Sequence, residues 1–221
     1  MKHYIFSDLH INDPRVDHAL VYATFANISK DDRVILNGDI IEGWTSDYRQ
    51  SVIKHFNLVK LILSKTTVYV VGNHDSFMKW VCLLNLGHIK FYYPYCLMEV
   101  DERKWYIEHG HLSGQYGSMF RFLDRIDNNT IFTDVVSHVT HWKMFSMQNK
   151  SRNAKDRMKA DAIEKGRKMG AEVVIVGHDH LCANYQSGNV RLVDAGTAVK
   201  TDKVKFTYAV YENGGFEIVN A

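Results

Sequence analysis

Residues 68–75 read VYVVGNHD. They show most clearly how this chain folds and which side chains it places at the end of a strand. The β-branched run at 66–71 predicts a buried strand, and Gly72 lets the backbone turn sharply where that strand ends. Asn73 and His74 then stand at the strand tip, where an amide oxygen can bind a metal and an imidazole can act on a substrate. An Asx turn that leads into a helix is the alternative interpretation of the same residues.

Other segments repeat this order of a strand-like run followed by oxygen or imidazole side chains. The side chains concerned are Asp8 and His10, Asp39, His109, and His178 and His180. A carboxylate and an imidazole two residues apart suit a divalent transition metal, and a carboxylate at a strand tip could bridge two metals. Each motif alone could be an ordinary turn. Their recurrence at successive strand tips predicts a two-metal site, and such sites mostly hydrolyse phosphate esters.

The first half of the chain alternates strand-like and helix-like stretches, and the last third is rich in strands. Strands are expected over 2–6, 33–37, 66–71, 89–92, 97–100, 104–108, 173–176, 191–193, 206–211 and 216–219, and helices over 16–29 and 50–64. Residues 213–215, Asn-Gly-Gly, predict a hairpin turn. This mixture predicts an α/β protein of two packed sheets flanked by helices. A length of 221 residues suits a single domain over 1–221.

Residues 112–170 differ from their surroundings and are expected to form a helical insertion within that domain. The segment begins rich in glycine, continues with aromatic and apolar residues, and becomes basic over 143–168. The basic part is either a solvated helix face or a site for an anionic partner such as nucleic acid, a membrane surface or a nucleotide. Arg121 and Arg125 would share a helical face and could likewise meet phosphate or solvent.

Composition limits the remaining possibilities. The net charge of +2 neither favours nor excludes nucleic acid as a partner. The three cysteines form no CxxC pair, so a disulfide framework or a zinc ribbon is not expected. No signal peptide is evident, and no apolar stretch approaches the ~20 residues of a membrane span. We therefore expect a cytoplasmic protein without an integral membrane segment.

The motifs D-x-H, GD, GNHD, H and GHDH, in this order, resemble those of the calcineurin-like metallophosphoesterase superfamily over about residues 4–197. The resemblance implies a four-layer α/β/β/α sandwich with two divalent metal ions at the sheet ends, Mn²⁺ ahead of Fe, Zn, Co or Ni. One metal would be held by Asp8, His10 and His180, and the other by Asn73, His109 and His178. Asp39 would bridge them, His74 would be the acid at the leaving-group oxygen, and Asp75 would be the partner of His74.

A closer resemblance links residues 38–44, GDIIEGW, to the second motif of UDP-2,3-diacylglucosamine hydrolases, which cleave a pyrophosphate. Those enzymes also carry a helical insertion, and residues 150–155 resemble its substrate-binding helix. The resemblance implies that a diphosphate or sugar meets Ser151, Asn153, Lys155 and Lys159, and Arg121 is a further candidate for phosphate. His74 and His111 stand where those hydrolases have arginine and aspartate, a form typical of the general phosphoesterase.

The function expected from these features is hydrolysis of a phosphate ester or pyrophosphate in a small molecule by metal-activated hydroxide. A nucleoside-diphosphate sugar is one substrate of this kind. A phosphodiesterase or nuclease acting on nucleic acid is the first alternative, supported by the basic insertion, and a protein phosphatase is the second. A non-catalytic scaffold of the same fold is a fourth possibility, which loss of any ligand would have favoured.

Overall fold

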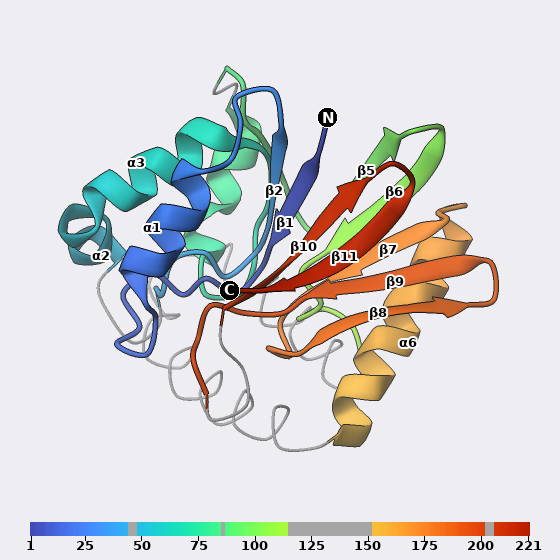
Figure 1. Ribbon diagram of the computed structural model, residues 1–221. Coiled ribbons are helices and arrows are strands. Elements are labelled where there is room, and N and C mark those ends of the chain that lie inside the picture. The colour runs from blue at the N-terminus through green and yellow to red at the C-terminus, as the bar shows by residue number, and fades with distance from the viewer. Residues whose placement is uncertain (44–47, 85–86, 115–151, 202–205) are drawn as a thin grey trace.

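The computed structural model describes residues 1–43, 48–84, 87–114, 152–201 and 206–221. Two sheets pack face to face, and helices cover the outer face of each (Figure 1). The helices are α1 (His18–Ala26), α2 (Tyr48–Lys54), α3 (Phe56–Lys65), the 3-10 helix η1 (Ser76–Leu83) and α6 (Arg152–Lys168). The predicted α/β/β/α arrangement is confirmed.

The first sheet has the strand order β11-β10-β1-β2-β3-β4, and the second has the order β5-β6-β7-β9-β8. The strands of the first sheet are β1 (His3–Phe6), β2 (Arg33–Asn37), β3 (Thr66–Val70), β4 (Lys90–Tyr92), β10 (Thr207–Glu212) and β11 (Gly215–Asn220). Those of the second are β5 (Tyr95–Val100), β6 (Arg103–Glu108), β7 (Val173–Val176), β8 (Cys182–Ser187) and β9 (Val190–Ala195).

Parallel pairing brings the ends of the motif-bearing strands together. In the first sheet β1, β2, β3 and β4 run parallel, and in the second β6, β7 and β9 do. The carboxyl ends of parallel strands lie at the same edge of a sheet. The two edges also touch, since Asn37 Nδ2 at the end of β2 donates to the Glu108 carbonyl of β6 at 3.1 Å. The candidate ligands therefore meet from both sheets.

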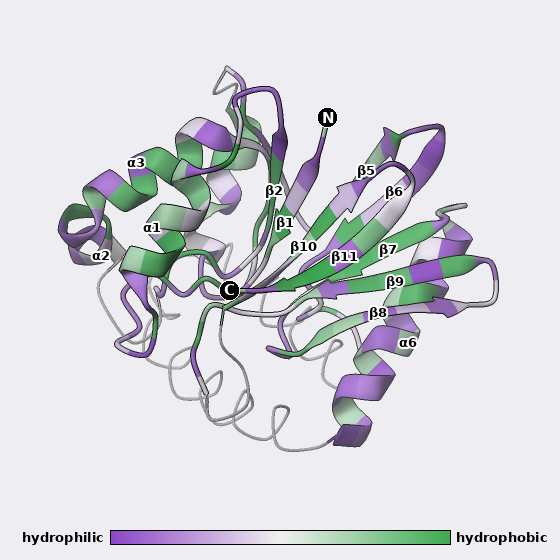
Figure 2. Cartoon of the chain, viewed as in Figure 1, coloured by the Kyte–Doolittle hydropathy of each residue, from purple (hydrophilic) through white to green (hydrophobic). Residues whose placement is uncertain are grey.

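The central strands β1, β2, β3 and β7 are largely buried on both faces, which explains their continuous apolar runs (Figure 2). On β1, Ile5 faces the second sheet, whereas Phe6 packs against the helices. On β7, Ile175 faces the first sheet, whereas Val174 packs in the cluster that includes Ala162 of α6. Alternate residues thus serve three separate cores.

Two details of the expected secondary structure differ. The helix expected over 50–64 is divided into α2 and α3 at His55, whose ring stacks on His18 of α1 with 4.1 Å between centroids. Strand β8 was not predicted, because its sequence CANYQS has no apolar alternation and it lies at a sheet edge. The expected hairpin turn is present, with Asn213 and Gly214 at φ 50° and 81° between paired residues Glu212 and Gly215.

Of the expected insertion, the structure describes residues 112–114 and, from 152 onward, helix α6. Residues 115–151, including Ser151 and Arg121, lie outside the described part of the chain. The single domain over 1–221 stays a prediction.

His3 offers a test of the core between the sheets. Its ring lies 5.8 Å from that of Trp105 and 5.9 Å from that of Tyr211, and burial followed by the charge of Arg33 lowers its pKa below the ordinary value. The folded chain therefore binds fewer protons than the unfolded chain as the pH falls below ~6.5. His3→Phe keeps the ring and should weaken the loss of stability between about pH 7.5 and 5.5. Urea unfolding of both chains measures this, and an unchanged loss would contradict it.

Candidate metal centre

Side chains that follow five different strands converge at one edge of the sandwich. Asp8, His10 and His180 form one group whose ligand atoms all lie within 4.8 Å of one another, and Asp39, His109 and His178 form another. A third group joins His10, Asp39 and His74. The three groups together contain every metal ligand predicted from the sequence except Asn73. The His10 and His180 Nε2 atoms are 3.2 Å apart, and Asp8 Oδ1 is 3.3 Å from His180 Nε2.

Asp39 lies between the two groups. Its Oδ2 is 3.0 Å from Nε2 of His109 and 3.9 Å from Nε2 of both His10 and His74. Its Oδ1 accepts a hydrogen bond from the His74 backbone N–H at 2.8 Å. One carboxylate thus fixes the backbone next to Asn73 and directs its other oxygen at the centre of the cluster.

The imidazoles are oriented by contacts on their Nδ1 atoms. His109 Nδ1 donates to the Asn37 carbonyl oxygen at 2.8 Å, which fixes the tautomer and leaves Nε2 facing Asp39. His10 Nδ1 lies 3.0 Å from Glu42 Oε2, so its Nε2 also faces the cluster. Ligand imidazoles in metal sites are usually held in this way through the other ring nitrogen.

Several candidate ligands have backbone conformations that L-amino acids rarely adopt. Five of them have φ values between 41° and 72°: Asp8, His10, Asp39, His178 and His180. Such residues cost about 1–3 kcal/mol each and persist only where surrounding contacts enforce them. Asp8 shows these contacts, since its N–H donates to the Gly38 carbonyl and its own carbonyl accepts from Ala198 N–H and Thr197 Oγ1.

Glycines allow the ligand loops to approach one another closely. A Cβ on Gly72 would lie 2.3 Å from Asp39 Oδ1, and one on Gly177 would lie 1.9 Å from Ser7 Oγ. Both distances are impossible for real contacts. Gly72 and Gly177, which precede Asn73 and His178, are therefore required for close packing of one loop against the next.

The charges of the site fit a pair of cations. Burial disfavours a protonated imidazole, but hydrogen bonds with Asp8 and Glu42 raise the pKa of His10 to about 10. The charges of Asp39 and Asp8 likewise overcome burial and raise the pKa of His109 to about 10. The buried carboxylates therefore demand positive charge at this point, and divalent metal ions would supply it in place of protons.

Asn73 supports the same conclusion. It is 5% exposed, and neither its amide oxygen nor its amide nitrogen has a hydrogen-bond partner among the described residues. A buried amide without partners is costly, whereas a metal ion would accept its oxygen as a neutral ligand. Together with the carboxylates and imidazoles, the donor set suits a transition metal.

The partner of His74 is Glu42, which corrects the expectation that Asp75 has this role. Glu42 Oε1 lies 2.9 Å from His74 Nδ1, while Oε2 contacts His10. Asp75 instead accepts from Ile40 N–H at 3.0 Å, from the Tyr69 hydroxyl at 2.5 Å and from Gly72 N–H at 2.6 Å. Asp75 therefore ties the loops after β2 and β3 together.

Glu42 is a residue of the candidate site that the sequence analysis missed. Burial opposes its ionisation, yet the hydrogen bonds with His10 and His74 hold the pKa of its carboxyl below the ordinary value. A signal was available, because Glu42 follows Asp39 by three residues within the second motif. The spacing alone does not tell which of two carboxylates, Glu42 or Asp75, reaches His74.

The described residues that were expected to bind substrate differ in their burial and in their contacts. Lys159 is buried, and its ammonium pairs inside the protein with Asp179 Oδ2 at 3.1 Å and Asp194 Oδ2 at 3.0 Å. Its contact with substrate stays a prediction. Lys155 Nζ donates to the Asp179 carbonyl at 2.7 Å, beside His180. Asn153 is exposed at the start of α6.

His111, to which the sequence analysis gave no role, is buried beside the cluster. Its ring centroid lies 5.5 Å from that of His109 and 6.3 Å from that of His178. Burial and then the charge of His109 hold its pKa well below the ordinary value, so the ring is neutral at physiological pH.

Comparison with known proteins agrees with this geometry. The sequence model of the calcineurin-like phosphoesterase superfamily domain matches residues 1–214. The chain belongs to that superfamily. This membership supports a hydrolase that acts on phosphoester bonds. No curated protein matches the chain.

Solved structures share the fold at low sequence identity. An archaeal phosphodiesterase is 17% identical, with a TM-score of 0.52 and complete coverage of both chains. Yfce, a phosphoesterase from E. coli, is also 17% identical, with a TM-score of 0.52 over 96% of this chain and 89% of that one. Vps29 of Chaetomium thermophilum is 9% identical, with a TM-score of 0.53 over 99% and 93%. These likenesses show the fold alone.

The described helices include none that is both long enough and apolar enough to cross a membrane.

Asp39→Asn tests the position of the bridging carboxylate. Mn²⁺ should raise the melting temperature of the unaltered chain, because a ligand that binds only the folded state stabilises it, by about 2.7 kcal/mol at one hundred times its Kd. The variant should lose most of this gain. Thermal unfolding with Mn²⁺ or EDTA measures it, with the exposed substitution Asp31→Asn as the control. An equal gain in the Asp39 variant would rule out a bridge at this residue.

Glu42→Gln tests the carboxylate that contacts both His10 and His74. The amide keeps the size of the side chain but removes the charge that orients both rings. We expect an affinity for Mn²⁺ about 10- to 100-fold lower, as for other residues that orient metal ligands. Calorimetric titration measures the change, and Glu212→Gln at the exposed ion pair with Lys2 is the matched control. Unaltered affinity would show that Glu42 does not support His10.

Proposed function

We propose that the chain hydrolyses a phosphate ester or phosphoanhydride at a centre of two divalent metal ions. The observation that carries this proposal is the position of Asp39, whose Oδ2 lies between the two ligand groups and 3.9 Å from His74 Nε2. Two metal ions bound there would supply a hydroxide nucleophile near neutral pH and would offset charge on the phosphate oxygens.

The proposed metals are held by Asp8, His10 and His180 on one side and by Asn73, His109 and His178 on the other, with Asp39 shared. The mixed oxygen and imidazole donors favour Mn²⁺, and Fe, Zn, Co or Ni fit the same donors. His180 has the most exposed side chain of these residues, at 20%. We infer that substrate approaches on the side of His180.

His74 is the proposed general acid for the leaving-group oxygen. Its Nδ1 is held by Glu42 and its Nε2 faces the cluster, which is the orientation that proton transfer requires. The contact with Glu42 Oε1 at 2.9 Å keeps the ring in this orientation. No covalent bond between the chain and the phosphoryl group is needed in this scheme.

The substrate class is proposed from the basic side chain near the site that can still donate hydrogen bonds. Lys155 lies beside His180, and its ammonium has donors beyond the one used for the Asp179 carbonyl. A small phosphate-containing molecule that reaches the metals past His180 would meet this lysine. A nucleoside-diphosphate sugar is the more specific version of the proposal, supported by the resemblance of residues 38–44 and by the helix that carries Lys155.

The deciding experiment compares substrates of different bond type. Protein reloaded with Mn²⁺ is tested on p-nitrophenyl phosphate, bis(p-nitrophenyl) phosphate and a UDP-sugar, with EDTA as the control. Metal-dependent cleavage supports the proposal, and the preferred substrate separates a monoesterase from a diesterase and a pyrophosphatase. Single-stranded DNA, RNA and a phosphopeptide test the nuclease and protein-phosphatase alternatives. No turnover of any substrate by metal-loaded protein would contradict a general phosphohydrolase.

His74→Asn tests the acid. The asparagine amide can still donate to Glu42 but cannot deliver a proton, so metal content should be unchanged. Turnover of a substrate with a poor leaving group should fall about 10²- to 10⁴-fold, the usual contribution of a positioned acid. Turnover of an aryl phosphate with an activated leaving group should fall much less. Equal losses on both substrates would argue that His74 does not protonate the leaving group.

A further inference from the structure

We propose that Lys159 is a positioning residue of the metal centre, which acts through Asp179 on the loop that presents His178 and His180. The proposal rests on the proposed function, because a residue that positions metal ligands requires the proposed metal centre. Lys159 itself is not one of the proposed ligands. In place of the predicted contact with substrate, Lys159 contacts Asp179, which lies between His178 and His180 in the chain.

Within the described part of the chain, the ammonium of Lys159 pairs with two buried carboxylates. Its Nζ lies 3.1 Å from Asp179 Oδ2 and 3.0 Å from Asp194 Oδ2, and Lys159 is 7% exposed. Asp194 belongs to β9, and its Oδ1 accepts from Gly196 N–H at 3.1 Å. The ammonium therefore joins α6, a strand of the second sheet and the GHDH loop.

Asp179 shapes the loop between the two candidate ligands. Its Oδ1 accepts from Leu181 N–H at 2.9 Å, and its N–H donates to the Gly177 carbonyl at 2.9 Å. His178 and His180 on either side have φ values of 72° and 58°. Because these conformations need outside support, a fixed Asp179 carboxylate determines where both imidazoles lie. Lys155, one turn before Lys159, holds the Asp179 carbonyl as well.

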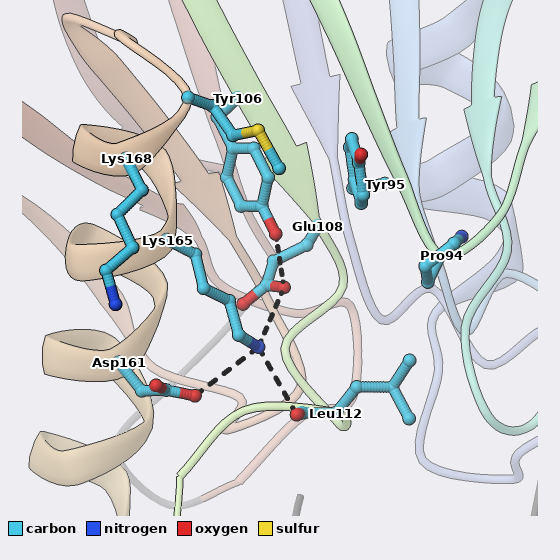
Figure 3. Close-up of a pocket in the computed structure, with 9 residues that line it drawn as sticks. Pro94, Tyr95, Tyr106, Glu108, Leu112, Asp161, Lys165 and Lys168 are labelled. Carbon is cyan, nitrogen blue, oxygen red and sulfur yellow. Dashed lines mark hydrogen bonds and ion pairs between the residues drawn. The ribbon is translucent and has the colours of Figure 1, made fainter. Parts of the chain in front are cut away.

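Helix α6 supports the other ligand loop of the second sheet in the same manner. Asp161 Oδ2 accepts from Gly114 N–H at 3.1 Å. Lys165 Nζ lies 3.4 Å from Glu108 Oε2, next to His109 in the chain, and donates to the Leu112 carbonyl at 3.3 Å (Figure 3). One helix therefore contacts the loops that carry three of the candidate ligands.

Stability alone does not account for a lysine in this position. A buried ion cluster loses the hydration of its charges, and well-packed apolar residues of similar volume are often as stabilising. The charged cluster instead fixes the position of the Asp179 carboxylate. A role in positioning also predicts a kinetic pattern that differs from substrate binding, namely a lower kcat with little change in KM.

The test uses variants that separate folding from positioning. Lys159→Met combined with Asp194→Asn removes the ammonium and one of its two carboxylates. Lys159→Arg keeps the charge but changes the shape of the group that meets Asp179. Lys168→Met is the matched control, because Lys168 lies on the same helix with a side chain that is 72% exposed. Each chain is examined for urea unfolding, for Co²⁺ affinity, for the visible spectrum of bound Co²⁺, and for kcat and KM.

The double variant should fold but bind Co²⁺ about 10- to 100-fold more weakly, as when partners of metal ligands are lost. Its Co²⁺ spectrum should change, the arginine variant should be intermediate, and the Lys168 control should equal the unaltered chain. Wild-type affinity and spectrum in every folded variant would overturn the proposal, and so would failure of both Lys159 variants to fold. Failure of the unaltered chain to bind Co²⁺ or Mn²⁺ would instead overturn the metal centre itself.

Discussion

Asp8 and Asp39 are fully buried at one edge of the sandwich, and the rest of the centre depends on how their negative charge is balanced. Without cations the balance comes from protons, because the nearby carboxylates overcome the effect of burial and raise the pKa of His10 and His109 to about 10. His178, whose pKa burial and His109 lower to about 3, stays neutral. Metal binding at this edge therefore exchanges protons for metal charge, and it removes the repulsion that the folded chain otherwise carries.

That edge exists because of strand direction. Parallel strands in both sheets end at the same side, so short loops after β1, β2, β3, β6 and β7 must meet there. This consequence of topology was predictable from the sequence, since each motif follows an apolar run. Strand β8 and the break at His55 were not, because a polar edge strand lacks periodicity and a ring stacked on His18 is a tertiary contact.

The sequence points to the candidate ligands for a second reason. A metal requires specific donor types, and the sequence displays them beside glycines that permit close approach. The supporting residues were not predictable to the same degree. Asp75 follows His74 directly, yet the contact with its ring comes from Glu42, thirty-two residues away in the chain. Sequence proximity says little about which carboxylate reaches a ring nitrogen once the loop between them has turned.

Lys159 extends this argument to a whole helix. Basic residues on a helix near an anion site are readily interpreted as substrate contacts, and Lys155 still fits that interpretation. Lys159 is only one turn away, but it points to buried carboxylates and not to solvent. The difference follows from the packing of α6 against β7 and β9. The face of α6 that carries Lys159 lies against Asp194 and Asp179, and the lysine balances their negative charge. In our proposal the same helix meets substrate at its first turn and fixes the candidate metal ligands from its second.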